Sequence, residues 1–282
     1  MMKKCLITIL SLILLVSIFT SCAADPSEEE VRSRFTSYSP DSNVVAVWED
    51  RIFHFPDYEL NLNNIAEDED LEIGFVLADG KVYFATSKQN GLFGDYSLYV
   101  YSCDFYGNNE QLLFEKHGYK TGIGVRANQG KFYFSHHTTN VFDASTQVID
   151  SYDVVTGVYQ TEATGKDANL SDYQKKARGS YSCTYEGDVL RVVDEKNDVT
   201  YTIAPESLFG STFSKELEGL KWEYSGFYAT DNGKMFLLYC VNTNWPPYPH
   251  ILCEYIPESN EIVFSLLYFA HDIIGFRIEY LQ

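Results

Sequence analysis

Two cysteines near the C-terminus, Cys240 and Cys253, are placed where a disulfide could join neighbouring strands. They flank the stretch Asn244–Pro249, whose prolines indicate a loop between two strands. In a symmetric hairpin the two thiols face each other, and an exported domain would allow them to oxidise. The sequence leaves two hypotheses open, a cross-strand disulfide and a pair of buried free thiols. No CxxC pair occurs, which argues against a zinc ribbon.

The loop between these cysteines has the most distinctive surface chemistry of the chain. Its aromatic and imidazole side chains lie among prolines, which stiffen the backbone. The residues are Trp245, Pro246, Pro247, Tyr248, Pro249 and His250. Exposed aromatic side chains on a rigid loop suit contact with a sugar or a protein partner. The alternative is a loop that folds back onto its own domain.

Three further motifs suggest metal or cofactor binding, and none has the context it needs. His136 and His137 are adjacent in an expected strand, so their rings point to opposite faces. The acidic run 67–72 lacks the glycine and the ligand spacing of a calcium-binding EF-hand loop. Residues 122–127 match G-x-G-x-x-A, but a turn and a strand follow where a dinucleotide site needs a helix. We therefore predict neither a metal site nor a cofactor.

Catalytic motifs are also missing from the sequence. There is no G-x-S-x-G nucleophile elbow and no H-E-x-x-H helix. A carboxylate pair for glycoside hydrolysis need not be close in sequence, and the 40 acidic residues single out no pair. We therefore assign no catalytic residues.

The N-terminus has the pattern of an export signal. Lys3 and Lys4 precede an apolar run, residues 5–19, which is followed by the small polar residues Thr20 and Ser21. The apolar run is shorter than the roughly 20 residues that a membrane-spanning helix needs. The alternatives to a lipoprotein signal are an ordinary signal peptide cut near residues 23–24 and an uncleaved anchor.

The residues Phe19-Thr20-Ser21-Cys22 resemble a bacterial lipobox, although Phe19 stands where the pattern favours Leu. This resemblance implies that residues 1–21 form a lipoprotein signal peptide and that Cys22 becomes an acylated N-terminus. Buried acyl chains contribute about 0.8 kcal/mol per CH₂ to membrane binding. The expected location is the outer face of a bacterial membrane, to which the protein is anchored through Cys22.

Composition points to a strand-rich domain with an acidic surface. Aromatic residues, which favour strands, make up 16% of the chain, and the formal net charge is −19. An acidic surface repels phosphate backbones, so we expect no nucleic-acid partner. Residues 22–43 are polar without a sustained period, and we expect a flexible tether there. From residue 44 to residue 282, short alternating strands are separated by turn signals.

A turn that leads into a strand recurs along residues 44–282. The copies are 78–84, 128–134 and 231–237, with a looser copy at 186–192 and a degenerate first copy at 48–55. Their Asp-Gly and Asn-Gly pairs tolerate the positive φ of a tight hairpin. A second hairpin follows most copies, so each repeat holds about four strands, as in a propeller blade. Residues 205–220 break the pattern and indicate a loop with a helical turn.

These repeats are similar to TolB-like and related β-propeller repeats. The resemblance covers residues 44–282 and implies an all-β propeller of five or six four-stranded blades, with no catalytic residues carried over. Residues 276–280 form a final alternating strand that could close the ring against the N-terminal strand. The alternative fold is a pair of β-sandwiches.

The expected function is a non-enzymatic binding or scaffolding lipoprotein, with an envelope protein or a glycan as its partner. The Trp245–His250 loop is the candidate contact. The alternative is an extracellular hydrolase that acts on cell-surface sugars or peptides from a propeller channel. Convergent acidic and histidine side chains in a central pocket would favour the enzyme, and a channel filled by apolar side chains would favour the scaffold.

Overall fold

A computed structural model describes most of the chain. The described residues are 26–48, 51–62, 74–91, 95–128, 130–139, 144–173, 180–230, 232–243, 246–270 and 276–281. The signal segment and Cys22 lie outside these ranges, as do Trp245 and the acidic run 67–72. Within the described ranges, no helix has the length and apolar character required to cross a membrane.

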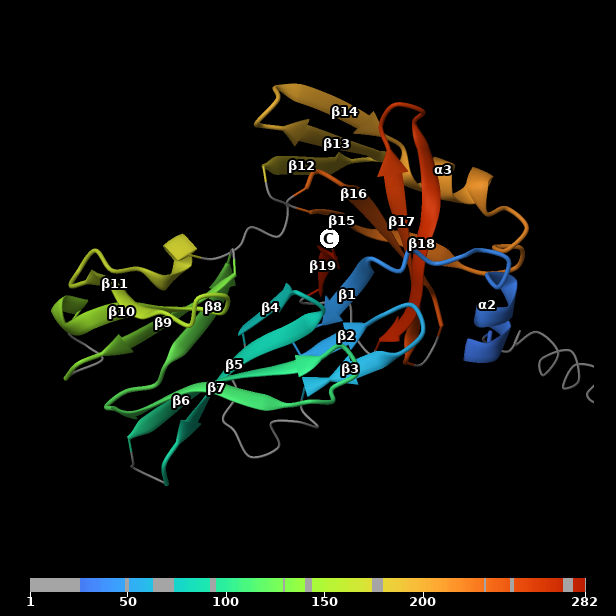
Figure 1. Ribbon diagram of the computed structural model, residues 1–282. Coiled ribbons are helices and arrows are strands. Elements are labelled where there is room, and N and C mark those ends of the chain that lie inside the picture. The colour runs from blue at the N-terminus through green and yellow to red at the C-terminus, as the bar shows by residue number, and fades with distance from the viewer. Residues whose placement is uncertain are drawn as a thin grey trace, which may run out of the picture.

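The described chain forms five antiparallel sheets, which confirms the expected all-β propeller of four-stranded blades in all but one blade (Figure 1). Blade 1 contains β19 (Phe276–Tyr280), β1 (Val44–Trp48), β2 (Ile52–His54) and β3 (Glu59–Asn61). Blade 2 contains β4 (Gly74–Ala78), β5 (Lys81–Gln89), β6 (Tyr96–Asp104) and β7 (Gln111–Tyr119). Blade 3 contains β8 (Gly124–Asn128), β9 (Lys131–His137), β10 (Gln147–Asp153) and β11 (Tyr159–Thr164).

The two remaining blades come from the C-terminal half. Blade 4 has three strands, β12 (Tyr181–Glu186), β13 (Val189–Asp194) and β14 (Val199–Ile203). Blade 5 contains β15 (Trp222–Ala229), β16 (Met235–Val241), β17 (Tyr248–Ile256) and β18 (Glu261–Ala270). Where blade 4 would continue into a fourth strand, the chain forms helix α3 (Pro205–Thr212), which begins with a proline at its first turn. Short 3₁₀ turns, η2 (Ala144–Thr146) and η3 (Leu170–Tyr173), accompany blade 3.

The two ends of the β-domain meet in blade 1, as the sequence predicted. The C-terminal strand β19 pairs with β1 in an antiparallel register that runs from Val44 opposite Tyr280 to Trp48 opposite Phe276. Strand β19 therefore takes the first position of the blade, and β1, β2 and β3 follow it outward. This pairing covers an edge of β1 that would otherwise present unpaired backbone groups.

The recurring turn occupies the same place in blades 2 to 5, between the first and second strands. Asp79 and Gly80 in blade 2 have φ values of 51° and 71°, as the tight hairpin requires. The proposed first copy, residues 48–55, is not equivalent, because it joins the second and third strands of blade 1. The reason is topological, since the first strand of that blade comes from the C-terminus.

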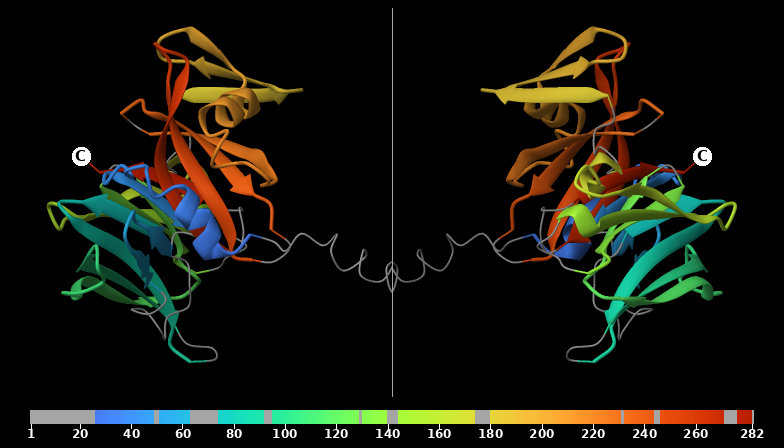
Figure 2. Two further views of the ribbon diagram at one scale, coloured as in Figure 1. Left: turned by 90° about the vertical axis from the view of Figure 1, so that its right-hand side faces the viewer. Right: turned by 90° about the vertical axis from the view of Figure 1, so that its left-hand side faces the viewer.

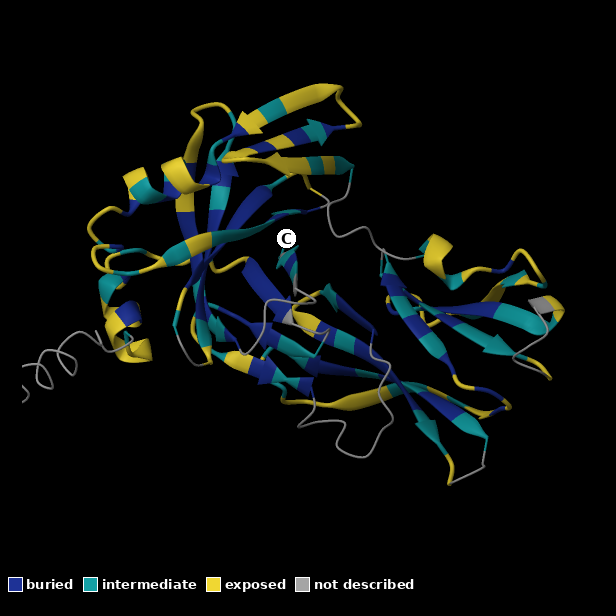
Figure 3. Ribbon diagram, turned by 180° about the vertical axis from the view of Figure 1, so that it is seen from behind, coloured by how far each residue is buried: buried dark blue, intermediate teal, exposed yellow. Residues whose placement is uncertain are grey.

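Apolar side chains on both faces of a strand join neighbouring blades. In β1, Val45 and Val47 pack toward blade 2, whereas Val44 and Ala46 pack toward blade 5. In β16, Leu237 faces the cluster shared with blade 4, along with Tyr239 and Val241. Such strands are buried on both sides, so they are nearly continuous apolar runs (Figure 3). The outer strands β7 and β14 are mostly exposed or half-buried.

Four hydrophobic clusters link the blades in the order 3, 2, 1, 5 and 4. This serial packing of five sheets sets aside the alternative of two β-sandwiches. None of these clusters of described residues joins blade 3 to blade 4, and Figure 1 shows these two blades at opposite ends of the chain of sheets. The helix α3 contributes Phe209 to the cluster between blades 4 and 5, where its ring stacks on Tyr239 at 3.8 Å.

The prediction of a flexible tether over residues 22–43 is wrong for its described part. Residues Glu28–Arg34 form helix α2, whose N-cap Ser27 accepts a hydrogen bond from the Glu30 amide. Val31 and Phe35 lie on one face, four residues apart, and both are buried against blade 5 (Figure 2). Only these two apolar residues mark the buried face, so the mostly polar composition of the segment gave no clear indication of an amphipathic helix.

Loss of the Phe35 ring should destabilise the protein. Phe35 is 3% exposed and its ring lies 5.8 Å from the rings of Phe213 and Phe264. We expect Phe35→Ala to lower the free energy of unfolding by about 3 kcal/mol in urea titrations. Glu29→Ala, on the exposed side of the same helix, should change it by less than about 0.5 kcal/mol. Equal effects of the two variants would mean that the segment is not part of the folded core.

Candidate functional site

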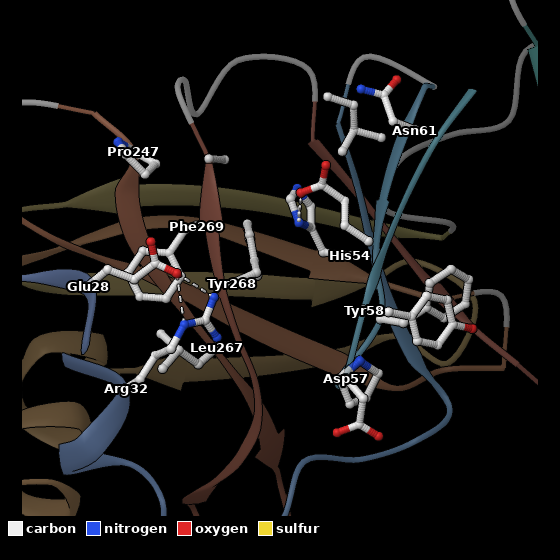
Figure 4. Close-up of a pocket in the computed structure, with 15 residues that line it drawn as sticks. Glu28, Arg32, His54, Asp57, Tyr58, Asn61, Pro247, Leu267, Tyr268 and Phe269 are labelled. Atoms are coloured by element: carbon white, nitrogen blue, oxygen red, sulfur yellow. Dashed lines mark hydrogen bonds and ion pairs between the residues drawn. The ribbon is translucent and has the colours of Figure 1, made fainter. Parts of the chain in front are cut away.

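A pocket of about 520 Å³ lies where blade 1, blade 5 and helix α2 meet (Figure 4). It is bordered by β3 and β18, the outermost strands of their blades, so it lies at the rim of the propeller. We call it the His54 pocket. The residues that line it are Glu28, Arg32, Ile52, His54, Phe55, Pro56, Asp57, Tyr58, Glu59, Asn61, Pro247, Leu267, Tyr268, Phe269 and Ala270.

His54 forms the buried wall of this pocket. It lies on β2 opposite Glu59 of β3, and the imidazole Nδ1 is 3.4 Å from the Glu59 carboxylate. Burial lowers the pKa of His54 to about 4, so the ring is neutral at pH 7. A carboxylate beside Nδ1 favours the tautomer with its proton there, which makes Nε2 an acceptor. Among the described residues, the buried Nε2 has no hydrogen-bond partner.

A column of three rings connects the pocket to the strand that follows the Pro-rich loop. The Tyr268 ring stacks on His54 at 4.9 Å and on His250 at 5.1 Å. His250 is fully buried, whereas Pro246 and Pro247 are exposed and Tyr248 is half-buried. The predicted contact loop is therefore divided, because Pro246 and Pro247 reach the surface whereas Pro249 and His250 are buried in the blade. Pro247 itself lines the pocket.

Helix α2 contributes opposite charges to the pocket. The Arg32 Nε donates a hydrogen bond of 2.9 Å to Glu28, and the guanidinium lies 4.3 Å from the centre of the Phe269 ring. Figure 4 shows the ion pair between Arg32 and the Glu28 carboxylate as dashed lines, beside the Phe269 ring. Among the described residues that line the pocket, Arg32 is the one cationic side chain, against the carboxylates of Glu28, Asp57 and Glu59. With His54 neutral, the lining has a formal charge of −2.

The hairpin 55–59 supplies an aromatic stack beside the carboxylates. The Tyr58 ring lies 4.5 Å from Phe55 on one side and 4.5 Å from Tyr106 of blade 2 on the other. Burial, assisted by nearby acidic groups, raises the pKa of Tyr58 to about 12, so the phenol remains protonated. The stack fixes the backbone that presents Asp57 and Glu59, which is a positioning role.

The hypothesis of a disulfide between Cys240 and Cys253 is wrong. Cys240 lies opposite His250 and Cys253 lies opposite Leu237, so the hairpin register is offset by three residues from a symmetric one. An odd offset places the two cysteines on opposite faces of the sheet. Both thiols are free and buried.

These thiols should therefore be inert in the folded protein. Burial raises the pKa of Cys240 to about 11, which lowers its thiolate population about a hundredfold from that of an ordinary cysteine. Mass spectrometry of unreduced peptides should show Cys240 and Cys253 unlinked and, after brief maleimide treatment of the native protein, unlabelled. The half-buried Cys183 serves as the accessible control. A linked peptide pair would contradict this structure.

His136 and His137 point to different partners, as the alternation of strand side chains requires. The His137 Nδ1 lies 3.2 Å from the Thr146 hydroxyl, and the His136 Nε2 lies 3.0 Å from the Asp150 carboxylate. No group of three or more His, Cys, Asp or Glu residues within the described ranges is arranged to hold a metal ion. Residues 124–128 of the glycine motif form strand β8 and not a helix, so the motif lacks a dinucleotide-binding context.

A buried polar network between blades 2 and 3 escaped the sequence analysis. Asp150 of β10 is 2% exposed and accepts hydrogen bonds from His136, Tyr159 and Thr161, and Lys116 of β7 lies 3.7 Å away. Burial acts to raise the pKa of Asp150, but these hydrogen bonds and Lys116 outweigh it and hold the pKa at about 2. In the sequence, the only sign of this network was Asp150 itself, a charged residue within a strand that is mostly buried.

The network continues to the Tyr119 hydroxyl, which lies 2.8 Å from that of Tyr159. Lys116 donates to the Tyr159 hydroxyl at 2.9 Å and lies 4.3 Å from the centre of that ring. Because the carboxylate of Asp150 has three donors and a cation, the network is satisfied internally. Its role is to join two blades, in contrast to the open His54 pocket.

Comparison with known proteins identifies no family. No protein-family model matches the chain, and no curated protein matches it. Among solved structures, the crystal structure of HIRA(644-1017) is 12% identical, covers 68% of this chain and 52% of its own, and has a TM-score of 0.25. A GH43 β-1,3-galactosidase with galactodeoxynojirimycin is 13% identical, covers 71% of this chain and 61% of its own, and has a TM-score of 0.23.

The GH43 protein BlXynB from Bacillus licheniformis is 9% identical, covers 70% of this chain and 42% of its own, and has a TM-score of 0.25. The present chain therefore spans about two fifths to three fifths of the lengths of these structures. Similarity at these TM-scores carries no conclusion about activity, substrate or partner. The assignment of a propeller depends on the strand order, the closing β19–β1 pair and the serial packing of the blades.

Proposed function

We propose that the protein is an exported lipoprotein, anchored through Cys22, that acts as a non-enzymatic binding module with the His54 pocket as its ligand site. The observation that supports this proposal most is the pocket itself. It brings the buried, neutral imidazole of His54 together with the carboxylates of Glu28, Asp57 and Glu59. Concave sites with a few convergent polar groups are typical of ligand binding, and a volume of about 520 Å³ is in the usual range.

The N-terminal helix ties this site to the proposed anchor. Glu28 is six positions after Cys22 in the sequence, and an extended chain of six steps spans at most about 20 Å. Because Glu28 lines the pocket, an acylated Cys22 would hold the pocket within that distance of the membrane surface. The ligand is then a component of the envelope that lies close to the membrane, such as a glycan, a lipid headgroup or the exposed part of an envelope protein.

The alternative, an extracellular hydrolase, has one observation in its favour. The pocket brings His54 together with Glu59 and other carboxylates, which is a set of groups that hydrolases use. The pocket lies at the rim, however, and the outermost strands border it, whereas the hydrolase was expected to work from the propeller channel. Turnover of a surface sugar or peptide that disappears in Glu59→Gln would establish the hydrolase in place of the binding module.

Intact mass and membrane partitioning of the native protein, beside Cys22→Ala, test the anchor. We expect a diacyl mass increment on Cys22 and loss of membrane partitioning in the variant. A soluble mature protein without acyl mass would show an ordinary secreted domain and would overturn the lipoprotein part of the proposal. Cys183→Ala, which leaves the lipobox intact, is the control for cysteine replacement.

A further inference from the structure

Blade 4 ends at strand β14, in the position where each of the other four blades continues to a fourth strand (Figure 1). We propose that a second copy of this chain fills the vacant position, through antiparallel pairing of its own β14 with β14 of the first copy. A two-fold axis at Tyr201 relates the two strands, so each copy supplies the fourth strand of the other's blade 4. No residue of β14 lines the His54 pocket, so the inference does not depend on the proposed function.

The segment that follows β14 leaves the fourth position of blade 4 open. After Ile203 the chain enters helix α3, which packs against β15 and β18 of blade 5. Within the described ranges, β13 is the one strand that pairs with β14. Thr200 and Thr202 are exposed, and Val199 is 39% exposed. The outer edge of β14 is therefore accessible to another strand.

Thr200 and Thr202 direct their backbone groups toward this edge. The Glu195 amide donates to the Ser180 carbonyl, which adds a hydrogen-bonded pair to the β12–β13 ladder. Because hydrogen-bonded pairs alternate along antiparallel strands, the first, third and fifth residues of β14 bond to β13. The amides and carbonyls of the two threonines between them point outward. In the two-fold pair, Thr200 of each copy exchanges both of these hydrogen bonds with Thr202 of the other.

The side chains of β14 follow nearly the same order in both directions. The strand is Val-Thr-Tyr-Thr-Ile, so a two-fold axis at its centre sets Tyr201 opposite its own copy. On either side of the axis, Thr200 lies opposite Thr202. The outer pair is Val199 and Ile203. Aromatic, threonine and β-branched pairs of this kind stabilise antiparallel strands. Because β14 has no charged residue, the pairing opposes no like charges, although each copy has a net charge of −19.

The other outer strands are protected against such pairing, and β14 is not. β3 has only three residues, and Ser265 of β18 accepts a hydrogen bond from the Asp41 amide. β7 carries Glu115 and Lys116, and register shifts interrupt its pairing with β6. β11 carries Glu162, and its pairing with β10 also shifts. Charges and bulges are common defences of a sheet edge, and β14 has neither.

Engineered cysteines test the register of the pair. Thr200→Cys and Thr202→Cys change exposed positions, and both are made in Cys183→Ala protein to remove the half-buried thiol. A mixture of the two full-length variants should form a disulfide-linked dimer under mild oxidation, because the new cysteines lie opposite each other. Either variant alone should give at least about tenfold less dimer, because each cysteine and its copy are diagonal neighbours, too far apart for a disulfide.

A proline tests the edge of β14 itself. Thr200→Pro removes an amide that points away from β13, so the blade should stay folded by circular dichroism. Thr200→Val, the control, keeps the amide. A single strand pair is smaller than a standard interface, so we expect the full-length protein and Thr200→Val to dimerise with a Kd on the order of 10 µM. Thr200→Pro should dimerise at least about tenfold more weakly.

Sedimentation equilibrium in density-matched detergent measures these dissociation constants. A wild-type protein that stays monomeric at about 100 µM would overturn the proposal. Dimerisation of Thr200→Pro with the wild-type Kd would overturn it as well. So would equal disulfide formation in the mixed and the single cysteine variants, because it would show collision in place of a fixed register.

Discussion

Asp150→Asn should lower the free energy of unfolding by about 3 kcal/mol at pH 7, the largest effect we expect from a single polar substitution. The carboxylate of Asp150 accepts hydrogen bonds from His136 and Thr161 at 3.0 and 2.7 Å, and Tyr159 donates a third. An amide at this position presents two donor hydrogens to groups that are themselves donors, and Lys116 loses its counter-ion.

The pH dependence should identify the carboxylate as the cause. The pKa of Asp150 is about 2 in the folded protein and about 3.9 in an unfolded chain, so the unfolded state binds a proton first as the pH falls. The stabilisation of roughly 2.5 kcal/mol is complete above about pH 4 and is lost as the pH falls toward 2. The difference between wild type and Asp150→Asn should therefore shrink over this interval.

Urea titrations of the two proteins at pH 7, 5 and 3 measure this difference. Asp79→Asn is the matched control, because Asp79 is an exposed turn residue whose positive φ asparagine also tolerates. The control should change the free energy of unfolding by less than about 0.5 kcal/mol at each pH. A difference between wild type and Asp150→Asn that stays constant from pH 7 to pH 3 would contradict the assigned network.

Removal of residues 276–282 should have an even larger effect, with a loss of at least about 4 kcal/mol and aggregation of the product. Strand β19 pairs with β1 over five residues, and Ile278 is buried in the cluster between blades 1 and 5. Without β19, β1 exposes an unpaired edge that can template association with another chain. Circular dichroism and size-exclusion chromatography of the truncated protein would show the change.

A point substitution separates packing at this seam from loss of the strand. Ile278→Ala keeps the backbone of β19 and should cost about 3 kcal/mol. Val263→Ala, at a position in β18 that is 54% exposed, should cost less than about 1 kcal/mol. If the truncated protein unfolded with the same midpoint as the full chain, the C-terminal strand would not close the propeller.

The hairpins were predictable because their information is local. A pair such as Asp79-Gly80 can adopt positive φ values without help from the rest of the fold, and alternation of apolar residues defines the strands on either side. The closing role of residues 276–280 followed from the same alternation. The first strand of blade 1 nevertheless comes from the other end of the chain, so the segment 48–55, interpreted as a degenerate first copy, is not equivalent to the other copies.

The relation between distant residues was decided only by tertiary structure. The cysteine pair shows this most clearly, because a register offset of three residues reversed the face on which Cys240 lies relative to Cys253. A symmetric hairpin was assumed from the local sequence alone. The register of β16 and β17 depends instead on which side chains fill the hydrophobic clusters on both faces of blade 5. Polar composition likewise predicted a flexible tether, whereas Val31 and Phe35 of that segment are buried against blade 5.

The candidate site was likewise decided by tertiary structure. Its groups come from helix α2, the β2–β3 hairpin and strand β18, which are far apart in the sequence and each unremarkable alone. The sequence by itself determined an acidic, strand-rich repeat domain and an N-terminal export pattern, because composition, turn chemistry and alternation act over a few residues. The packing of blade 5 against blade 1 decided where His54 and its neighbouring carboxylates meet, because burial and charge at a site depend on every element that surrounds it.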